Sequence, residues 1–514
     1  MDLAPFRPAF ASDYAAAARA YALDLVASAL LFFSATIMAG RVWRFPFDDE
    51  LIALSPIERS HSAIELVSFY LKGGDIHPPL SFLMFYGLQH MGLSEAGMRL
   101  VSIAMTAVSL ILFHLIALVL LVRRNGKPVA MPTRLIAVLL FALCPLALGQ
   151  GDAIRWYPVF AMLVALFVTF YLFGSNDTAR LWAAVPLGLA ASTNFLAVLV
   201  AAPLAIYRYG LQRRFSLAFD GVFAIVVMLF AGLGLVSAGA VAVVRFGSAM
   251  HSEFAVGPLR AALTNALGVF GGDALGISQA WILVPVVLIA LLAMLSAIDR
   301  KQPVDPVHLL LLMLAAAALI ALPGFAKPRS FLYLAPVLMG FLTLFLDRQV
   351  RHRGPGVAVL LVILVLAPSV AAIANINGGT HPFKRNSAIP YQSIIDFIAT
   401  NGTANDLVIA TDPVVPWLLR HKENSGGCTS RFFSNRDCFA AGRRYDSIFV
   451  ISGHNDGSDS PAFVARFNSA VDGLIAGRRK VATIHAGVDK DAALKTWLTG
   501  VPLGEAILTV DLYR

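Results

Sequence analysis

Long apolar runs separated by short polar segments fill most of the chain as far as residue 374. A helix needs about 20 apolar residues to cross a bilayer core of about 30 Å. The pattern therefore predicts a polytopic α-helical membrane protein with about eleven transmembrane helices. The predicted spans are residues 21–40, 98–122, 132–149, 157–174, 180–194, 195–209, 220–244, 280–297, 307–323, 331–346 and 357–374.

Clusters of Lys and Arg set the predicted topology, because such residues concentrate in cytoplasmic loops. The clusters lie at residues 123–134, 208–214, 300–301 and 348–353. Counting Pro79–Gly92 as a span would invert every later loop, and its roughly 14 residues cover only about 21 Å. We therefore expect a re-entrant or interfacial helix there. With a cytoplasmic N-terminus, the loops 41–97 and 245–280 and the C-terminal region are predicted to lie outside.

The first outer loop, residues 41–97, has a helical pattern of its own. Ser55 suits an N-cap, Pro56 the first helical position and Glu58 the third, and Gly73-Gly74 suits the end of a helix. This predicts one helix of about 16 residues lying flat on the membrane. It either forms part of a lid over the bundle or only anchors the loop.

After residue 374 the pattern becomes that of a soluble protein. Helical and strand-like segments alternate, which predicts a small α/β domain. Helices are expected at 391–400, 414–421 and 462–476, and strands at 407–410, 447–452, 481–485 and 507–512. The predicted division is a transmembrane domain over residues 1–376, which includes the loop 41–97, and a periplasmic α/β domain over residues 377–514. No Gly-rich phosphate loop opens a helix of the second domain.

Composition agrees with this picture and excludes one function class. Of all residues 58% are hydrophobic and only 14% charged, and the net charge is +9. In a soluble protein that charge would suggest nucleic-acid binding, but here it reports topology, so nucleic acid is excluded as a partner. Cys428 and Cys438 lie in a polar loop of the α/β domain and could pair in an oxidising periplasm, or remain two free thiols.

Candidate chemistry gathers in three segments that are predicted to lie at the outer membrane level. Asp48, Asp49 and Glu50 follow the first span directly. The others are Asp75-Ile76-His77-Pro78-Pro79-Leu80 and Gly149-Gln150-Gly151-Asp152-Ala153-Ile154-Arg155-Trp156-Tyr157. A solvated acidic turn is the alternative reading of the three carboxylates alone.

These motifs, in this order, resemble those of a known family. The acidic pair after the first span, His-Pro-Pro-Leu, Ser94-Glu95-Ala96-Gly97-Met98-Arg99-Leu100 and Arg155-Trp156-Tyr157 resemble the GT-C glycosyltransferases. They are most similar to the protein O-mannosyltransferase and lipid A aminoarabinose transferase superfamily. The architecture corresponds over residues 21–374, and the specific motifs lie within residues 47–157. The resemblance implies a GT-C fold and an inverting transfer of sugar from a polyprenyl-phosphate carrier.

The resemblance also implies roles for single residues. Asp49 matches the catalytic aspartate and Glu50 its partner. Asp48 is an additional acid and the alternative candidate for the general base. A carboxylate there would take the proton from an acceptor hydroxyl. Arg155, Lys327 and Arg329 would hold the donor phosphate, since guanidinium groups bind phosphate oxygens well; the alternative is that these cations reach lipid headgroups.

One departure concerns the acid near Arg155. The family often has an acid two residues before that arginine, where this chain has Ala153, and the nearest acid is Asp152. Asp75, His77, Asp152 and Tyr157 are predicted to line the substrate site or to position its loops. A metal on His77, Asp75 and Asp152 is disfavoured because metal ligands usually cluster more tightly in sequence. No metal site or certain cofactor is predicted, and a divalent cation is left open.

The leading hypothesis is thus a glycosyltransferase in a bacterial inner membrane, with its active site and α/β domain in the periplasm. Its partners would be the lipid bilayer, a polyprenyl-phosphate-linked sugar and an acceptor hydroxyl on a glycan, lipid or protein. The alternatives are a transporter or flippase of lipid-linked sugars and a scaffolding protein. A transporter would favour charges near the membrane midplane and repeated halves, which the sequence does not show.

Overall fold

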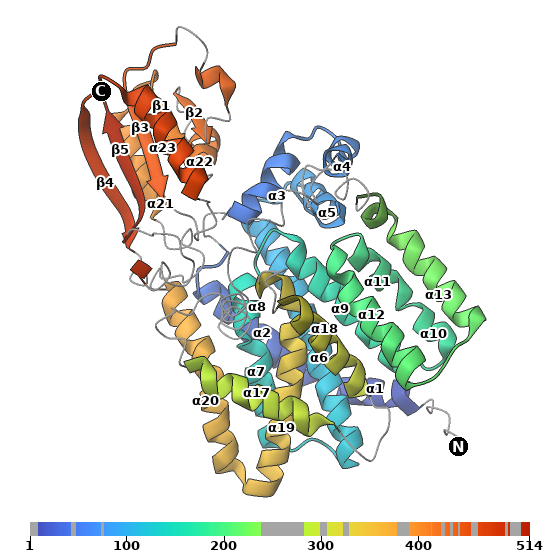
Figure 1. Ribbon diagram of the computed structural model, residues 1–514. Coiled ribbons are helices and arrows are strands. Elements are labelled where there is room, and N and C mark those ends of the chain that lie inside the picture. Colours follow the sequence, from blue (N-terminus) through green and yellow to red (C-terminus); the bar gives the residue numbers. More distant parts are fainter. Residues whose placement is uncertain are drawn as a thin grey trace. The chain divides into compact units, whose positions relative to one another are not determined.

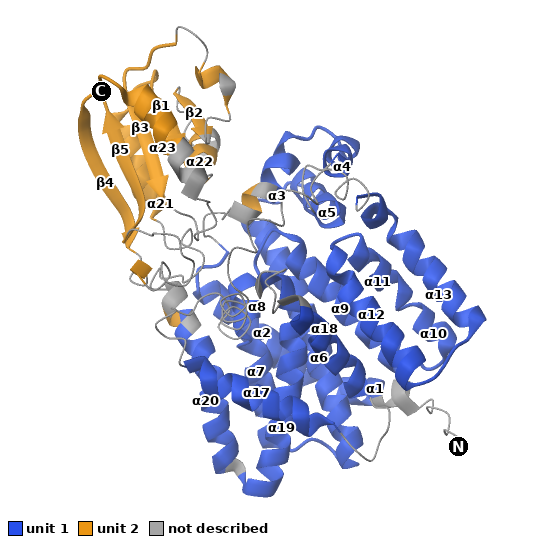
Figure 2. Cartoon of the chain, viewed as in Figure 1, with its two compact units in different colours: residues 1–43, 53–273, 280–373 blue, residues 44–52, 274–279, 374–514 orange. Residues whose placement is uncertain are grey.

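The computed structural model describes most of the chain, which forms two compact units (Figure 2). Unit 1 comprises residues 1–43, 53–273 and 280–373, and unit 2 comprises residues 44–52, 274–279 and 374–514. The described residues are 9–42, 48–72, 77–237, 282–298, 306–321, 328–377, 390–412, 414–422, 427–431, 435–439, 443–453, 461–488, 492–493 and 505–514. The predicted outer loop 245–280 lies outside them.

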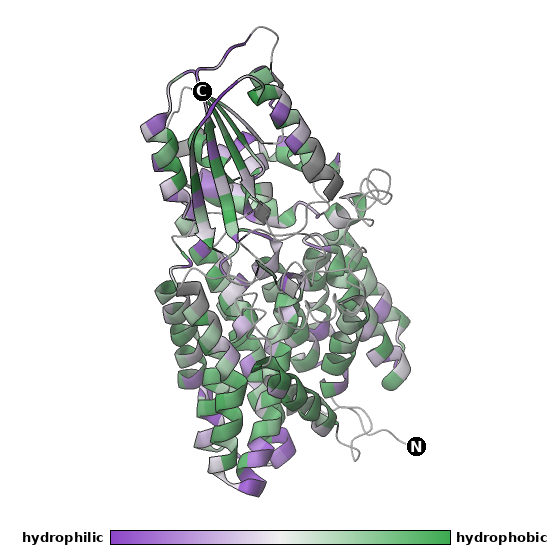
Figure 3. Ribbon diagram, turned by 60° about the vertical axis from the view of Figure 1, so that its left-hand side comes forward, coloured by the Kyte–Doolittle hydropathy of each residue, from purple (hydrophilic) through white to green (hydrophobic). Residues whose placement is uncertain are grey.

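Unit 1 is helical, and Figure 3 shows that hydrophobic residues cover most of its helices. Its helices before residue 180 are α1 (Ala9–Ala20), α2 (Ala22–Met38), α4 (Ala63–Leu71), α5 (Leu80–His90), α6 (Glu95–Asn125), α7 (Met131–Ala142), α8 (Pro145–Gln150), α9 (Trp156–Phe173) and α10 (Asp177–Leu181). The later ones are α11 (Ala184–Ala191), η1 (Phe195–Ala197), α12 (Val198–Ala205), η2 (Ile206–Leu211), α13 (Leu217–Phe230), α17 (Leu283–Ala297), α18 (Pro306–Ala321), η4 (Pro328–Leu334), α19 (Ala335–Arg353) and α20 (Pro355–Asn377).

Helix α6 is the central support of unit 1 (Figure 1). It is 31 residues long, begins at an N-cap where Ser94 accepts a hydrogen bond from the Gly97 amide, and ends at Gly126 in the left-handed region with φ +60°. It packs against α2, α9 and α19. One long, capped helix therefore contacts both α2, which precedes the acidic segment, and α9, which follows the 149–157 turn.

The chain is a multi-pass membrane protein by the length and apolarity of its helices. Within the described residues, four stretches qualify as spans: 95–125, 131–150, 156–173 and 329–353. A fifth arises if Tyr14–Ala20 and Ala22–Met38, bent by 66°, count as one. The structure does not confirm the predicted count of about eleven. In the stretch 180–209 the chain is broken into short pieces, and α11 and α12 have eight residues each.

The predicted single helix of the first outer loop is wrong. Helix α3 (Asp48–Arg59) already begins at Asp48 and contains Pro56, and α4 is a separate helix. The N-terminal cap lies at Ser62, whose hydroxyl accepts from the Glu65 amide, while the Glu65 carboxylate accepts from the His61 amide. The capping pattern that the sequence suggested at Ser55 thus occurs seven residues later. Helix α5 confirms the short helix that was predicted in place of a span at 79–92.

The loop helices share a hydrophobic core with the turn before α9. Its buried members come from α3, α4, α5, α6 and that turn: Ala53, Leu54, Ile57, Leu66, Tyr70, Phe82, Phe85, Tyr86, Met98 and Ile154. Tyr70 stacks on Phe82 with ring centroids 4.3 Å apart. The backbone amide of Leu80 also donates to the Ser192 carbonyl at 3.2 Å. The part of the loop from Ala53 onward is therefore packed into the core of unit 1.

Unit 2 contains a five-stranded mixed sheet in the order β2-β1-β3-β5-β4. The strands are β1 (Leu407–Ala410), β2 (Cys428–Arg431), β3 (Ile448–Gly453), β4 (Lys480–Val488) and β5 (Ala506–Tyr513). Strand β1 pairs in parallel with β2 and β3, and β5 pairs antiparallel with β3 and β4. The helices are α21 (Tyr391–Asn401), α22 (Val414–Lys422) and α23 (Pro461–Ile475), with the 3₁₀ turn η6 (Arg436–Phe439). The predicted helices and strands are present, and β2 is additional.

The two faces of this sheet carry separate cores, as alternation along a strand requires. Val408 and Phe449 belong to the core on one face, and Leu407 and Ile448 to the core on the other. On the first face, the buried carboxylate of Asp412 accepts hydrogen bonds from the Tyr391 hydroxyl and from two amides at the start of α22. That carboxylate fixes two helices to the end of β1.

Candidate functional site

The three consecutive carboxylates open helix α3. Asp48 is the first residue of the helix, and Glu50 is fully buried. The side chains of Asp48 and Asp49 lie outside the described residues. Residues 44–52 belong to unit 2, and Leu51 is part of the core of the α/β domain. The acidic segment was predicted as part of the transmembrane domain, whereas the structure groups it with the α/β domain.

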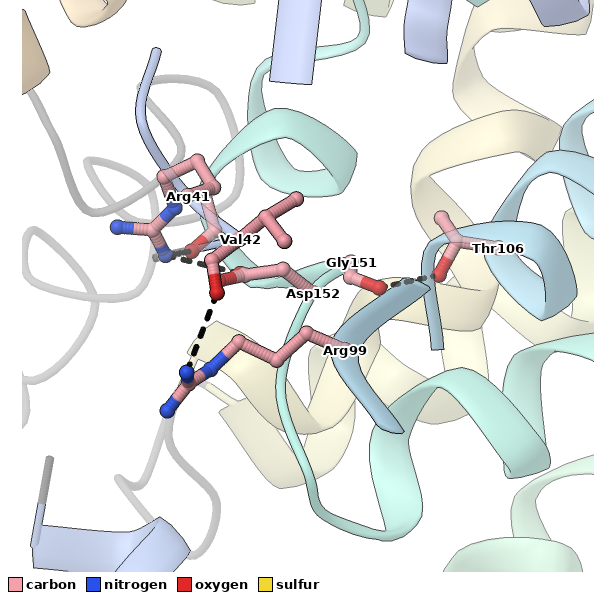
Figure 4. Close-up of polar contacts among 7 residues, drawn as sticks. Arg41, Val42, Arg99, Thr106, Gly151 and Asp152 are labelled. Atoms are coloured by element: carbon pink, nitrogen blue, oxygen red, sulfur yellow. Dashed lines mark hydrogen bonds and ion pairs between the residues drawn. The ribbon is translucent and has the colours of Figure 1, made fainter. Parts of the chain in front are cut away.

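A buried ion pair holds the turn before α9 in unit 1. The guanidinium of Arg41 donates to the Asp152 carboxylate at 3.0 Å and to the Gly149 carbonyl at 2.5 Å (Figure 4). Arg41 is 4% exposed and Asp152 is not exposed at all. Because both charges have left water, each compensates the other. Asp152, one position earlier in the sequence than the acid that the resemblance implied, thus ties the 149–156 turn to the end of the first span.

Helix α6 holds the same region through two further side chains. Arg99, 2% exposed, donates to the Val42 carbonyl at 3.3 Å and lies 3.6 Å from the Glu95 carboxylate. The Thr106 hydroxyl donates to the Gly151 carbonyl at 3.0 Å. Figure 4 shows these groups converging from α6, from the end of the first span and from the turn before α9. The Glu95 and Arg99 of the family-like motif therefore have a structural role here, in addition to any role in binding.

Arg155 is buried at the N-cap of α9, where its backbone is extended. Its guanidinium lies 5.6 Å from the centre of the Phe82 ring, a cation–π contact with helix α5. The next residue, Trp156, is also buried and stacks on His77, with ring centroids 5.3 Å apart, and meets Tyr157 edge-on at 4.5 Å. The structure therefore brings His77 to the ring of Trp156, the residue between the predicted site residues Arg155 and Tyr157.

A later segment of the chain joins this aromatic group. Phe160, one turn into α9, meets the Trp156 ring at 5.7 Å and the Tyr333 ring of η4 at 5.1 Å, both edge-on. Arg329, in the same short η4 element, is half-buried. Because η4 packs against α9 and α8, the late basic motif lies on the same part of unit 1 as the 149–157 turn. Lys327 and Asp75 lie outside the described residues.

The described part of the chain contains no group of three or more His, Cys, Asp and Glu side chains that could hold a metal ion. Two of the three residues that were considered as metal ligands have other contacts: Asp152 pairs with Arg41, and His77 stacks on Trp156. Elsewhere, Cys428 and Cys438 form a disulfide in unit 2 with their Cα atoms 5.6 Å apart, and Cys144 is buried and free.

The geometry assembles arginine-rich, aromatic-lined surroundings around the 149–157 turn. Two of the arginines, Arg41 and Arg99, were not singled out as site residues from sequence. Arg99 could have been found from its spacing of four from Glu95, which predicts a helical ion pair. Arg41 carried one signal, a cation placed directly after an apolar span, but its partner is more than a hundred residues away.

Comparison with solved structures identifies the architecture. Over 96% of this chain and 98% of the other, the structure matches a crystal structure of ArnT from Cupriavidus metallidurans bound to undecaprenyl phosphate, with a TM-score of 0.54 and 13% identity. The apo state of the same ArnT matches over the same shares, with a TM-score of 0.53 and 14% identity. The chain has the fold of ArnT.

That likeness confirms the GT-C-like fold that the motifs implied, and it extends over both units. It is a likeness of fold, because the identity is far below the level at which sequence alone would show it. No protein-family model matches the chain, and no curated protein matches it in sequence.

Proposed function

We propose that the protein is an inverting glycosyltransferase that moves a sugar from a polyprenyl-phosphate carrier to a hydroxyl acceptor on an envelope glycan, lipid or protein. The single observation that carries the proposal is the near full-length likeness to ArnT, a protein crystallised with undecaprenyl phosphate. The reaction is assigned to the periplasmic face of a bacterial inner membrane, on the basis of the basic cytoplasmic clusters.

In the proposed reaction the acceptor hydroxyl attacks the anomeric carbon of the sugar from the face opposite the phosphate. Asp49 takes the hydroxyl proton, with Asp48 as the rival candidate, as the new carbon–oxygen bond forms and the bond to the phosphate oxygen breaks. The polyprenyl phosphate leaves with the electron pair. Glu50, which is fully buried, is assigned to holding the start of α3 in place, since a buried carboxylate is costly unless its hydrogen-bonding partners are fixed.

Charge on the departing phosphate must be stabilised, and arginines are suited to that because their planar fork matches two phosphate oxygens. Arg155 and Arg329 are proposed for this role, together with Lys327. In support, Arg155 is held by the N-cap position of α9 and by the Phe82 ring, so its charge is in a fixed place before a substrate arrives. Fixed charges stabilise a transition state without the cost of reorganisation.

The remaining predicted residues are assigned to positioning. Asp152 fixes the 149–156 turn through Arg41, and His77 and Tyr157 both contact the Trp156 ring. Asp75 keeps its proposed place in the same group by its nearness to His77 in the sequence. These roles predict that conservative changes will weaken activity through the position of Arg155.

The test is transfer of labelled sugar from purified polyprenyl-phosphate donors to a membrane or envelope extract. Asp49→Asn is expected to abolish transfer while donor binding and folding persist, and Asp48→Asn is expected to retain part of the rate. Arg155→Gln should weaken both donor binding and turnover. Asp24→Asn, a change at an ion pair in another part of unit 1, is the matched control and should keep the rate within about threefold.

Two outcomes would contradict the proposal. Full activity in Asp49→Asn and in Asp48→Asn together would remove the proposed base. No transfer by the unmodified protein from any donor, combined with movement of labelled lipid-linked sugar across proteoliposome membranes, would replace the transferase with a flippase.

A further inference from the structure

The first turn of helix α3 has an unusual attachment. Leu51 is 6% exposed and belongs to the hydrophobic core on one face of the α/β domain's sheet. Residues from α21, α22, β1, β3 and β5 make up the rest of that core, among them Tyr391, Val415, Val408, Phe449 and Leu512. The residue before it, Glu50, is fully buried. Leu51, which directly follows the three carboxylates in sequence, is thus part of the packed interior of unit 2.

The backbone of helix α3 links Leu51 to the acidic residues directly before it. An α-helix moves nearly as a rigid rod over so few residues, because its hydrogen bonds link each turn to the next. A shift of the core around Leu51 is therefore transmitted to the backbone of Asp48 and Asp49, which are less than one turn away.

We propose that the α/β domain is a positioning element for the catalytic carboxylates, and that Leu51 is the side chain through which it acts. The inference deepens the proposed transfer reaction and rests on it, because it assigns a task to the domain only if Asp49 or Asp48 is the base. Leu51 is a positioning residue. Its side chain packs in the domain's hydrophobic core, and this packing fixes the position of the first turn of α3 and so of the carboxylate that takes the proton from the acceptor hydroxyl.

The physical argument concerns the reach of a general base. The base must lie within about 2.6–3.2 Å of the atom whose proton it removes. A misplacement of about 1 Å can cost about 100-fold in rate even when the altered residue is remote from the chemistry. Of the residues proposed to hold the donor phosphate, the two that the structure describes, Arg155 and Arg329, are not part of the core around Leu51, so a displaced carboxylate should lower kcat and leave the donor KM nearly unchanged.

The experiment measures kcat and the donor KM of the full-length protein for three variants. Leu51→Ala removes the anchor, and Leu51→Met keeps an apolar side chain of similar volume. Leu407→Ala is the matched control, since Leu407 is fully buried in the same domain but faces the core on the opposite side of the sheet. Hydrogen exchange at the amides of residues 51–54 is measured in each variant, because it reports the helix start without any need for activity.

Leu51→Ala is expected to lower kcat about 10- to 100-fold, with the donor KM within about twofold and faster exchange at residues 51–54. Leu51→Met should restore most of the rate, and Leu407→Ala should keep it although the domain is destabilised. An unchanged kcat in Leu51→Ala, or an equal loss in Leu407→Ala, would overturn the inference. Activity that survives in Asp49→Asn and in Asp48→Asn would instead overturn the proposed base, so the two failures are distinguishable.

Discussion

The buried ion pair between Arg41 and Asp152 allows a quantitative test of how the 149–156 turn is held. Both side chains are at most 4% exposed, and their charged atoms are 3.0 Å apart. Replacing Asp152 by Asn preserves shape and removes the negative charge that faces Arg41. Breaking a buried pair in this way costs about 3–5 kcal/mol. We expect Asp152→Asn to lower the free energy of unfolding by that amount.

The control uses a more exposed pair of the same chemistry. Asp24 accepts two hydrogen bonds from Arg134 at 2.7 and 3.0 Å, but the two side chains are 10% and 26% exposed. Water there compensates part of the loss, so Asp24→Asn should cost about 1 kcal/mol. Neutralising both members of the buried pair, in Arg41→Gln with Asp152→Asn, should cost at least about 1 kcal/mol less than the sum of the single changes.

Unfolding is followed by tryptophan fluorescence during titration with SDS in detergent micelles, and the double-mutant cycle is completed under the same conditions. A cost for Asp152→Asn no larger than that for Asp24→Asn would refute the reasoning. Strict additivity within the cycle would refute it as well, because the two side chains would then act independently.

Two further changes test other contacts. Gly151→Ala should destabilise unit 1 by about 1–3 kcal/mol, because an added Cβ would lie 2.5 Å from the Ala147 carbonyl oxygen and 2.9 Å from the Thr106 methyl carbon. Gly340→Ala is the control and should be tolerated, since the nearest atom to an added Cβ is 3.8 Å away. Equal thermal midpoints of the two variants in detergent would contradict this prediction. Cys428→Ser should lower the stability of unit 2 by about 3 kcal/mol, since the disulfide closes a loop with a sequence separation of 10; protease resistance that is the same with and without reductant would argue against it.

Much of the fold could be predicted because local patterns determine it. The apolar runs locate α6, α9, α19 and α20, and the alternation of helices and strands after residue 390 locates the α/β domain. Strand β2 was missed because its four residues, Cys428–Arg431, contain no apolar alternation and are held mainly by pairing with β1. The cap at Ser62 was missed because Ser55, Pro56 and Glu58 offer the same local signal, and only packing decides between them.

Some residues of the candidate site could also be predicted from the sequence, and others could not. His77, Arg155 and Tyr157 could be selected from motif order, and in the structure His77 and Tyr157 contact the Trp156 ring while Arg155 contacts the Phe82 ring. The partnership of Arg41 with Asp152 could not be predicted, since no local rule relates residues 111 positions apart. The packing of Leu51 in the core of the α/β domain joins residues still farther apart in sequence. An apolar residue in a helical pattern does not reveal which hydrophobic core it joins.

The packing of Leu51 also has a consequence for biogenesis. Leu51 leaves the ribosome roughly 340 residues before Tyr391, its companion in the core. At about 5–20 residues per second, synthesis delays their meeting by roughly 20 to 70 seconds. During this interval the first span can already be inserted, whereas the core that contains Leu51 cannot form before the α/β domain has been synthesised. If the proposed carboxylate is the base, the transferase would therefore become active only after the α/β domain has been synthesised.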